Sequence, residues 1–235
     1  MIFSTKFKKL LFIILNKTIS SIKKEEFHLD ENISLLYILK FVLIRTLMYI
    51  RGFFTFYKLV MIGKNTTILS SHQITFQKSL SIDNDCVVNA LSKEGIVFGS
   101  NVSIHKRTII ECTGSLKHIG KGLIIGNNVG IGSNSFLGCA GGIEIGDDTI
   151  IGNFVSMHSE NHNFDRYDIP IRMQGTTNKG IKIGQNCWIG AKVTILDGSV
   201  VGSGSIIAAG AVLNGKTYPP NSLIAGVPAR VIKSR

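Results

Sequence analysis

Residues 119–138 read IGKGLIIGNNVGIGSNSFLG and repeat an aliphatic residue followed by glycine at every sixth position. After residue 138 the same step returns at Ile145-Gly146, Ile151-Gly152, Ile183-Gly184, Ile189-Gly190 and Val201-Gly202. A period of six fits neither the 3.6 residues of a helical turn nor the plain alternation of a half-buried strand. It fits a coil of three short strands, in which each six-residue step is one flat side of a triangular prism and a corner. The sequence therefore predicts a mainly β fold built from stacked coils.

Each six-residue step has two positions that are expected to face the core. In the step from Ile125 to Gly130, the first and the fifth residues lie two strand periods apart, so both can point inward. Glycine and asparagine tolerate unusual backbone angles and suit the corners. A bulky fifth residue would not fit inside the prism, and these positions are indeed small or β-branched in Ser135, Thr149, Val155, Cys187, Val193, Ser205 and Ala211.

The pattern extends weakly backward to Ile62 and forward to about residue 232. Residues 61–235 are therefore predicted to form a parallel β-helix, in which each coil is buried by stacking on its neighbours. The repeat changes phase twice, first at residues 138–142 and then between Met157 and Ile183. The first break adds two residues at a corner, whereas the second, an excursion over residues 158–180, is long and polar. Such an excursion from a regular scaffold is where a repeat protein places a site.

Residues 1–60 form a separate, basic and apolar segment. They lack the repeat and hold ten Lys or Arg against four Asp or Glu, so they carry +6 of the net charge of +11. Apolar residues at helical spacing predict two helices, roughly over residues 3–24 and 32–58, separated by a polar stretch. No uncharged apolar run approaches the ~20 residues that span a bilayer.

Two roles are open for this segment, and both can hold on different faces. One is a helical cap over the open end of the β-helix. The other is an amphipathic anchor that lies on an anionic membrane surface. The candidate lipid contacts are Lys40, Arg45, Arg51 and Lys58, with Phe53, Phe54, Phe56 and Tyr57 at the interface. Because the charges are interleaved with bulky aliphatic residues, nucleic-acid binding is not expected.

The four cysteines are far apart and form no C-x-x-C pair. Cys86 and Cys187 fall at inward fifth positions of the repeat. The cysteines are therefore interpreted as small core residues of a protein in a reducing compartment, the bacterial cytoplasm, and not as disulfides or metal ligands.

Several motifs in and after the excursion share an order. They are Asn161-His162-Asn163-Phe164-Asp165, Ile169-Pro170-Ile171, Gln174-Gly175, Ile183-Gly184-Gln185-Asn186-Cys187-Trp188-Ile189-Gly190-Ala191 and Gly226-Val227-Pro228-Ala229-Arg230. In this order they resemble the hexapeptide-repeat O-acetyltransferases, over about residues 96–232. Within that family the chain is similar to the branch that acetylates sugars, including maltose and galactoside acetyltransferases and enzymes that decorate bacterial surface polysaccharides.

The resemblance implies a left-handed β-helix, acetyl-CoA as acyl donor, a sugar hydroxyl as acceptor, no metal, and a homotrimer whose sites lie between neighbouring chains. It also makes His162 the general base, because a hydroxyl is a poor nucleophile and an imidazole with a pKa near 6.5 can accept its proton. The small corner residues Ala191 and Ala209 match the positions where the pantetheine arm approaches the backbone, and Lys216 and Arg230 are the candidates for the phosphates.

The acceptor contacts are less clearly marked in the sequence. Asn134 lies near the place of an acceptor-binding asparagine of the family, and Asp165 is a further candidate for substrate binding. Glu160 or Asp165 is expected to orient the His162 ring, unless a backbone carbonyl does so. The chain departs from the family at Lys216, where it has one extra residue. Residues 1–60 also differ from the N-terminal region of the maltose type, which favours a polysaccharide acceptor over small free sugars.

Two other functions compete with this interpretation. A zinc-dependent, carbonic anhydrase-like hydratase on the same fold would use His158 and His162, with His105 or His118 as a third ligand. That reading leaves the acetyltransferase motifs unexplained. A non-catalytic β-helix scaffold, structural or attached to a membrane, is the other alternative.

Overall fold

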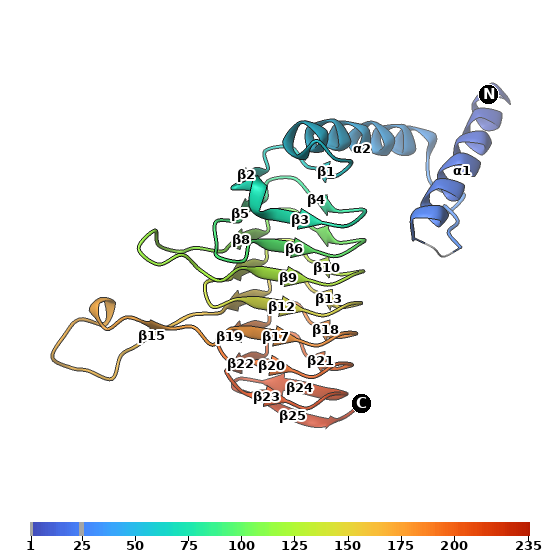
Figure 1. The fold of residues 1–235 in the computed structure, drawn as a ribbon. Coiled ribbons are helices and arrows are strands. Elements are labelled where there is room, and N and C mark those ends of the chain that lie inside the picture. The colour runs from blue at the N-terminus through green and yellow to red at the C-terminus, as the bar shows by residue number, and fades with distance from the viewer. Residues whose placement is uncertain (1, 24–25) are drawn as a thin grey trace.

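The computed structural model describes residues 2–23 and 26–235, and it shows a three-sided parallel β-helix with two helices at its N-terminal end (Figure 1). The helices are α1 (Ile2–Lys23) and α2 (Leu35–Phe56), and the last residue of the first predicted helix, residue 24, lies outside the described residues. Two short 3-10 helices are η1 (Ser71–Gln73) and η2 (Ile171–Met173).

Three parallel sheets form the sides of the prism, and successive strands of the chain pass from one sheet to the next. The first sheet contains β1 (Met61–Ile62), β4 (Ser81–Ile82), β7 (Ser103–Ile104), β10 (Gly130–Ile131), β13 (Ile150–Ile151), β18 (Trp188–Ile189), β21 (Ile206–Ile207), β24 (Ser222–Gly226) and the antiparallel β25 (Ala229–Ser234). The second contains β2 (Thr67–Leu69), β5 (Val87–Asn89), β8 (Ile109–Glu111), β11 (Phe136–Gly138), β14 (Ser156–His158), β19 (Thr194–Leu196) and β22 (Val212–Asn214). The third contains β3 (Ile74–Phe76), β6 (Ile96–Phe98), β9 (Leu123–Ile125), β12 (Ile143–Ile145), β17 (Ile181–Ile183), β20 (Val200–Val201) and β23 (Thr217–Tyr218).

The core follows the six-residue pattern. Every fifth-position residue named from the sequence is at most 2% exposed, and so is the first-position Ile125. The buried hydroxyl of Ser135 is satisfied within its own coil and by the next coil: Oγ donates to the carbonyl of Gly132 and accepts from the amide of Val155. Corners fall at Asn128, Asn134 and Asn186, which have positive φ. All four cysteines are buried, as the sequence predicts.

One predicted repeat step is wrong. Ile119-Gly120 belongs to no strand, and the Ile119 side chain is 42% exposed. These residues end a loop, residues 112–122, in which Thr113 Oγ1 accepts a hydrogen bond from the Gly120 amide at 3.0 Å. This bond closes the loop. The next coil therefore begins at Leu123, four residues later than the Ile119-Gly120 pair indicates.

Helix α2 lies across the N-terminal end of the prism, against the first coil (Figure 1). It begins at the cap residue Ser34, whose hydroxyl accepts from the Tyr37 amide, and its residues Ile38, Met48 and Gly52 are buried. Gly52 permits the closest approach, because a Cβ there would lie 1.9 Å from the carbonyl oxygen of Val60.

Three of the side chains considered for lipid contact are used in this packing instead. Arg51 Nε donates to the carbonyl of Ile62 at 2.9 Å, and Arg45 Nη1 donates to Ser81 Oγ at 3.3 Å. The Phe56 ring packs edge-on against Phe76 with centroids 5.4 Å apart. Their assignment to a membrane interface is therefore corrected: packing against the first coil turns them inward.

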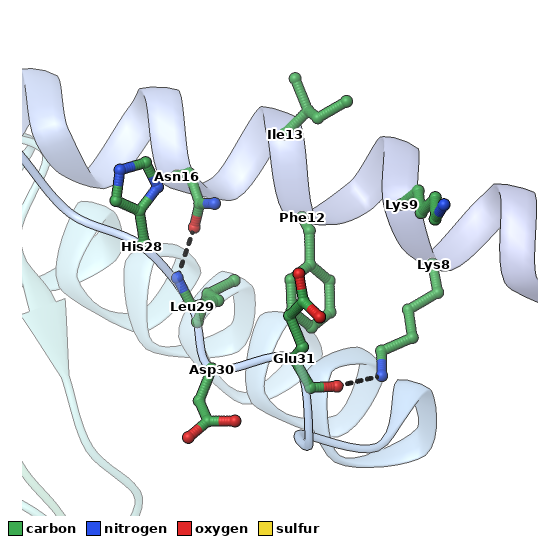
Figure 2. A pocket seen from close by; sticks show the side chains of 9 residues that line it. All are labelled: Lys8, Lys9, Phe12, Ile13, Asn16, His28, Leu29, Asp30 and Glu31. Atoms are coloured by element: carbon green, nitrogen blue, oxygen red, sulfur yellow. Dashed lines mark hydrogen bonds between the residues drawn. The ribbon is translucent and has the colours of Figure 1, made fainter.

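Helix α1 carries an open cavity of about 910 Å³ along one side. Figure 2 shows that residues 28–31 run beside the helix, where Asn16 Oδ1 accepts from the Leu29 amide and Lys8 Nζ donates to the carbonyl of Glu31. In the described part of the chain, neither helix is long and apolar enough to cross a bilayer.

Candidate functional site

The long excursion leaves the prism at the edge where the chain passes from the second sheet to the third, here called the second–third edge (Figure 1). Both of its ends are fixed to the coils. At the start, the buried Ser159 donates from Oγ to the carbonyl of Gly138 and accepts from the amide of Gly141. At the return, the buried carboxylate of Asp197 accepts from the amides of Lys179 and Gly180. Hydrogen bonds therefore hold both ends of the excursion in place. Neither of the two anchoring residues, Ser159 and Asp197, was singled out from the sequence.

A two-stranded antiparallel ladder forms the root of the excursion. Strand β15 (Asn161–His162) pairs with β16 (Thr176–Thr177), so that His162 lies opposite Thr176. The ladder continues where the Asn163 amide donates to the carbonyl of Gly175 at 3.0 Å. The backbone of His162 is therefore held, whereas its side chain is exposed to solvent.

Gln174 organises the outer part of the excursion. Its Nε2 donates to the carbonyls of Arg166 and Ile169, and its Oε1 accepts from the Arg166 amide. Arg166 also pairs with Asp168, and this hydrogen bond lowers the pKa of the Asp168 carboxyl from its ordinary value. Gly175 follows with a φ of +79°, a conformation that glycine adopts without strain. The Gln-Gly pair named as a motif thus has a structural role, which its position just before β16 could have indicated.

The carboxylates near His162 do not contact its ring. When the Asn178 amide is assigned from its hydrogen bonds, its nitrogen donates to Glu160 Oε2 at 3.2 Å. Asp165 is exposed. Among the described residues, no hydrogen bond joins either carboxylate to the imidazole of His162. Nor do three His, Cys, Asp or Glu side chains gather closely enough in this part of the chain to hold a metal ion.

His158 occupies a different environment from His162. It lies on the outer face of the second sheet in β14, where its Nε2 is 2.7 Å from Ser156 Oγ. Its ring stacks on Phe136 of the neighbouring strand with centroids 5.3 Å apart. These contacts give His158 a fixed orientation in the sheet.

The predicted cofactor residues Ala191 and Ala209 lie one above the other at the opposite edge of the second sheet, the first–second edge. The Gly210 amide donates to the carbonyl of Ala191 at 2.9 Å, and both alanine side chains are exposed. A Cβ on Gly190 would lie 2.6 Å from the Ala209 nitrogen, so glycine is needed for this spacing. Each of these two corner positions therefore carries only an exposed methyl group.

The remaining predicted residues are divided between the two edges. Asn134 lies at the first–second edge with a φ of +58°, and its Oδ1 accepts from Arg107 Nε at 2.8 Å. Lys216 lies at the second–third edge, in the turn between β22 and β23. Arg230 is exposed in β25, opposite Ala225. Within one chain, therefore, the structure places His162 and Asp165 at one edge and Asn134, Ala191 and Ala209 at the other.

Comparison with known proteins supports the repeat assignment. Residues 122–155 match the hexapeptide repeat of succinyl-transferase, and residues 180–215 match the bacterial transferase hexapeptide model of six repeats. Of the solved structures, AntD, an N-acyltransferase from Bacillus cereus, superimposes with a TM-score of 0.55 at 20% identity, covering 73% of this chain and 84% of that one. This likeness is one of fold.

Curated relatives match a shorter part of the chain. Escherichia coli WbbJ, whose name assigns it to O-acetyl transfer in lipopolysaccharide biosynthesis, is 36% identical over 98 residues, which cover 39% of this chain and 50% of the relative. The galactoside O-acetyltransferase of E. coli is 35% identical over 99 residues, which cover 39% of this chain and 43% of that enzyme. The chain thus spans half or less of the length of these relatives. Taken with the β-helix, these matches show that residues 122–155 and 180–215 are hexapeptide repeats of the kind found in bacterial transferases, and that the chain is similar to named O-acetyltransferases over about two fifths of its length.

Proposed function

We propose that the protein is an O-acetyltransferase that moves an acetyl group from acetyl-CoA to a sugar hydroxyl. The observation that carries the proposal is the exposed His162 on a hydrogen-bonded ladder that both Ser159 and Asp197 fix to the prism. An exposed imidazole on a rigid support has the properties of a general base that must reach a separate substrate. The similarity to WbbJ and to galactoside O-acetyltransferase supports transfer to oxygen on a sugar.

In the proposed mechanism, the His162 imidazole accepts the proton of the acceptor hydroxyl while the hydroxyl oxygen attacks the thioester carbonyl. The C–S bond breaks as the new C–O bond forms, so that coenzyme A leaves as a thiolate and the proton passes from the imidazolium to that sulfur. No acyl-enzyme forms. Because neither Glu160 nor Asp165 contacts the ring, a backbone carbonyl or a substrate group orients the imidazole when the site is occupied.

The donor lies along the first–second edge in this proposal. The exposed Ala191 and Ala209 leave the backbone of two neighbouring coils open to the pantetheine arm, and Arg230 is the proposed phosphate contact of the same chain. Lys216 lies at the second–third edge, so its proposed contact with the phosphates would come from the neighbouring chain. His162 lies at the other edge of the same sheet, so one chain alone does not bring base and donor together. A homotrimer, in which the second–third edge of one chain meets the first–second edge of the next, would complete the site.

The acceptor is proposed to be a glycan of the bacterial surface, an O-antigen, capsule or exopolysaccharide, at the cytoplasmic face of the inner membrane. Asn134 and Asp165 are its proposed contacts. Arg107 engages only the oxygen of the Asn134 amide, and among residues 2–23 and 26–235 no partner holds its nitrogen, which therefore remains as a donor.

The direct test is release of free thiol from acetyl-CoA in the presence of sugars and lipid-linked sugar intermediates. His162→Ala should reduce turnover at least about 100-fold, the usual contribution of a general base, with an unchanged unfolding midpoint. The matched control is His118→Ala, because His118 is also an exposed histidine on a loop at the second–third edge.

Turnover by His162→Ala at the wild-type rate would remove His162 from the mechanism. Absence of acetyl-CoA-dependent thiol release with every acceptor, together with tightly retained zinc near one ion per chain, would instead favour the hydratase.

A further inference from the structure

Helix α2 is apolar on both of its long faces. Its inner face carries the buried Met48 and Gly52, and Gly52 packs against Val60 at the start of the prism, whereas the buried Ile38 lies beside Leu15 and Ile19 of α1. The opposite face carries a second row of large apolar side chains at spacings of three and four residues, which places them along one line of the helix. This outer stripe consists of Leu36, Leu39, Leu43, Leu47, Ile50 and Phe54, each at least 42% exposed.

The outer stripe covers one end of the molecule. Figure 1 shows α2 lying across the N-terminal end of the prism, at the opposite end from the C-terminus. Since the inner face of α2 packs on the first coil, the outer stripe faces away from the coils. A continuous apolar surface of this length on a globular protein marks an interaction site.

The charges around the stripe favour an anionic partner. Neither α1 nor α2 contains an Asp or Glu residue, and Lys40 is exposed beside the stripe. In α1, Lys9 and Lys17 are exposed as well. Residues 1–60 hold ten Lys or Arg against four Asp or Glu, so a second copy of this face would set one net positive surface against another, which is unfavourable. An anionic lipid surface offers both an apolar interior and negative headgroups to this combination.

We propose that α2 lies in the plane of an anionic bilayer surface, with the outer stripe buried at the boundary between headgroups and acyl chains and with Lys40 among the phosphates. The helix does not cross the bilayer; it lies about 5–10 Å deep. Because Arg51 binds its inner face to the first coil and Arg45 binds it to the second, the prism then stands upright on the membrane.

This orientation sets the height of the excursion above the lipid. In the second sheet, β14 is the fourth strand after β2, and strands are spaced about 4.8 Å apart, so the excursion begins about 20 Å beyond the first coil. If the acceptor is attached to a lipid, the sugar that reaches the excursion would then lie at about this distance from the lipid. This consequence rests on the proposed function, whereas the membrane contact itself does not.

The first experiment is co-sedimentation of the full chain with vesicles of phosphatidylcholine alone and with about 30% phosphatidylglycerol. The wild type should pellet with the anionic vesicles, and binding should weaken as salt is raised. Leu43→Gln/Ile50→Gln removes two central side chains of the stripe and should lower vesicle affinity at least about tenfold. The control is Leu116→Gln/Ile119→Gln, which changes two exposed apolar side chains of the 112–122 loop and should bind as the wild type does.

The second experiment uses the burial of all four native cysteines. Ile50→Cys introduces an exposed thiol on the stripe, to which a polarity-sensitive fluorophore can be attached, and Leu116→Cys is the matched control. Anionic vesicles should shift the emission of the Ile50→Cys label to shorter wavelength and leave that of Leu116→Cys unchanged.

Three results would overturn the proposal. They are a wild type that stays in solution with both kinds of vesicle, a stripe variant that binds as tightly as the wild type, and equal emission shifts at the two labels. A stripe variant that changes the sedimentation coefficient without changing vesicle binding would show that the outer stripe joins copies of the chain. Loss of vesicle binding with acetyl transfer intact on a water-soluble sugar would separate this inference from the proposed function.

Discussion

At the scale of single residues, glycine sets the distance between neighbouring coils at the corner assigned to the donor. A Cβ at Gly190 would lie 2.6 Å from the backbone nitrogen of Ala209, closer than real contacts allow. Gly190→Ala should therefore push this corner apart, at a cost of about 1–3 kcal/mol in the free energy of unfolding, and raise KM for acetyl-CoA. Urea unfolding and thiol-release kinetics would measure the two effects.

Gly130→Ala is the control for this change, because Gly130 is a glycine of the first sheet, in β10, and a Cβ there meets nothing within 4 Å. It should leave both the unfolding midpoint and KM near the wild-type values. If the two variants behave alike, close packing at Gly190 is not what shapes the corner.

At the scale of elements, the outer part of the excursion is held by hydrogen bonds of the Gln174 side chain and not by a hydrophobic core. Gln174→Ala removes the bonds to the backbone of Arg166 and Ile169 while leaving the ladder at His162 in place. We expect faster proteolytic cleavage within residues 165–172 and a lower kcat, with an unfolding midpoint close to that of the wild type, because the excursion is exposed. Limited proteolysis, urea unfolding and kinetics on one preparation would measure these effects.

Met173→Ala serves as the comparison for the excursion, since the Met173 side chain is 61% exposed. Equal cleavage rates for the two variants would mean that the Gln174 side chain does not hold the excursion.

At the scale of the whole molecule, buried thiols make stability depend on alkaline pH. Burial raises the pKa of Cys86, Cys139 and Cys187 above the ordinary value of 9.0. In the unfolded chain the thiols ionise near pH 9, whereas in the folded chain they stay protonated. Their contribution is therefore complete below pH 9 and is lost as the pH rises through the raised folded values.

The free energy of unfolding should accordingly fall as the pH rises above about 9, as measured by urea unfolding at a series of alkaline pH values. Cys86→Ala/Cys187→Ala should show a smaller fall. An identical slope in this variant would assign the alkaline loss to other groups, such as Tyr218, whose pKa burial also raises.

The division of the site between two edges predicts complementation between chains. His162→Ala affects the second–third edge, and Ala209→Glu would block the donor corner at the first–second edge. Each variant alone should be inactive, but trimers reassembled from equal amounts should recover roughly a quarter of wild-type activity, because roughly a quarter of their interfaces join two intact edges. Wild-type and mixed samples that sediment as monomers, or a mixture that stays inactive while forming trimers, would contradict a shared site.

The six-residue period determined the fold because every coil depends on small inward side chains at fixed spacing, and Ser135, Thr149 and Cys187 are buried as it requires. The same local rule failed at Ile119-Gly120. This pair has the residue types of a repeat step, but it lies in a loop that is closed by the hydrogen bond from the Gly120 amide to Thr113 Oγ1. Hydrogen bonds between residues distant in sequence, such as Asp197 with Lys179, could not be deduced from spacing.

The sequence by itself determined the repeat, the two helices, the break that carries His162 and the family motifs, because these features depend on local spacing and residue type. Only the tertiary structure decided that the candidate residues lie at two different edges of one sheet and that Arg45, Arg51 and Phe56 face the prism. It also showed that α2 turns a second apolar face outward. The reason is physical: the direction in which a side chain points depends on what the neighbouring coils and helices already cover, and that is a property of the packed molecule.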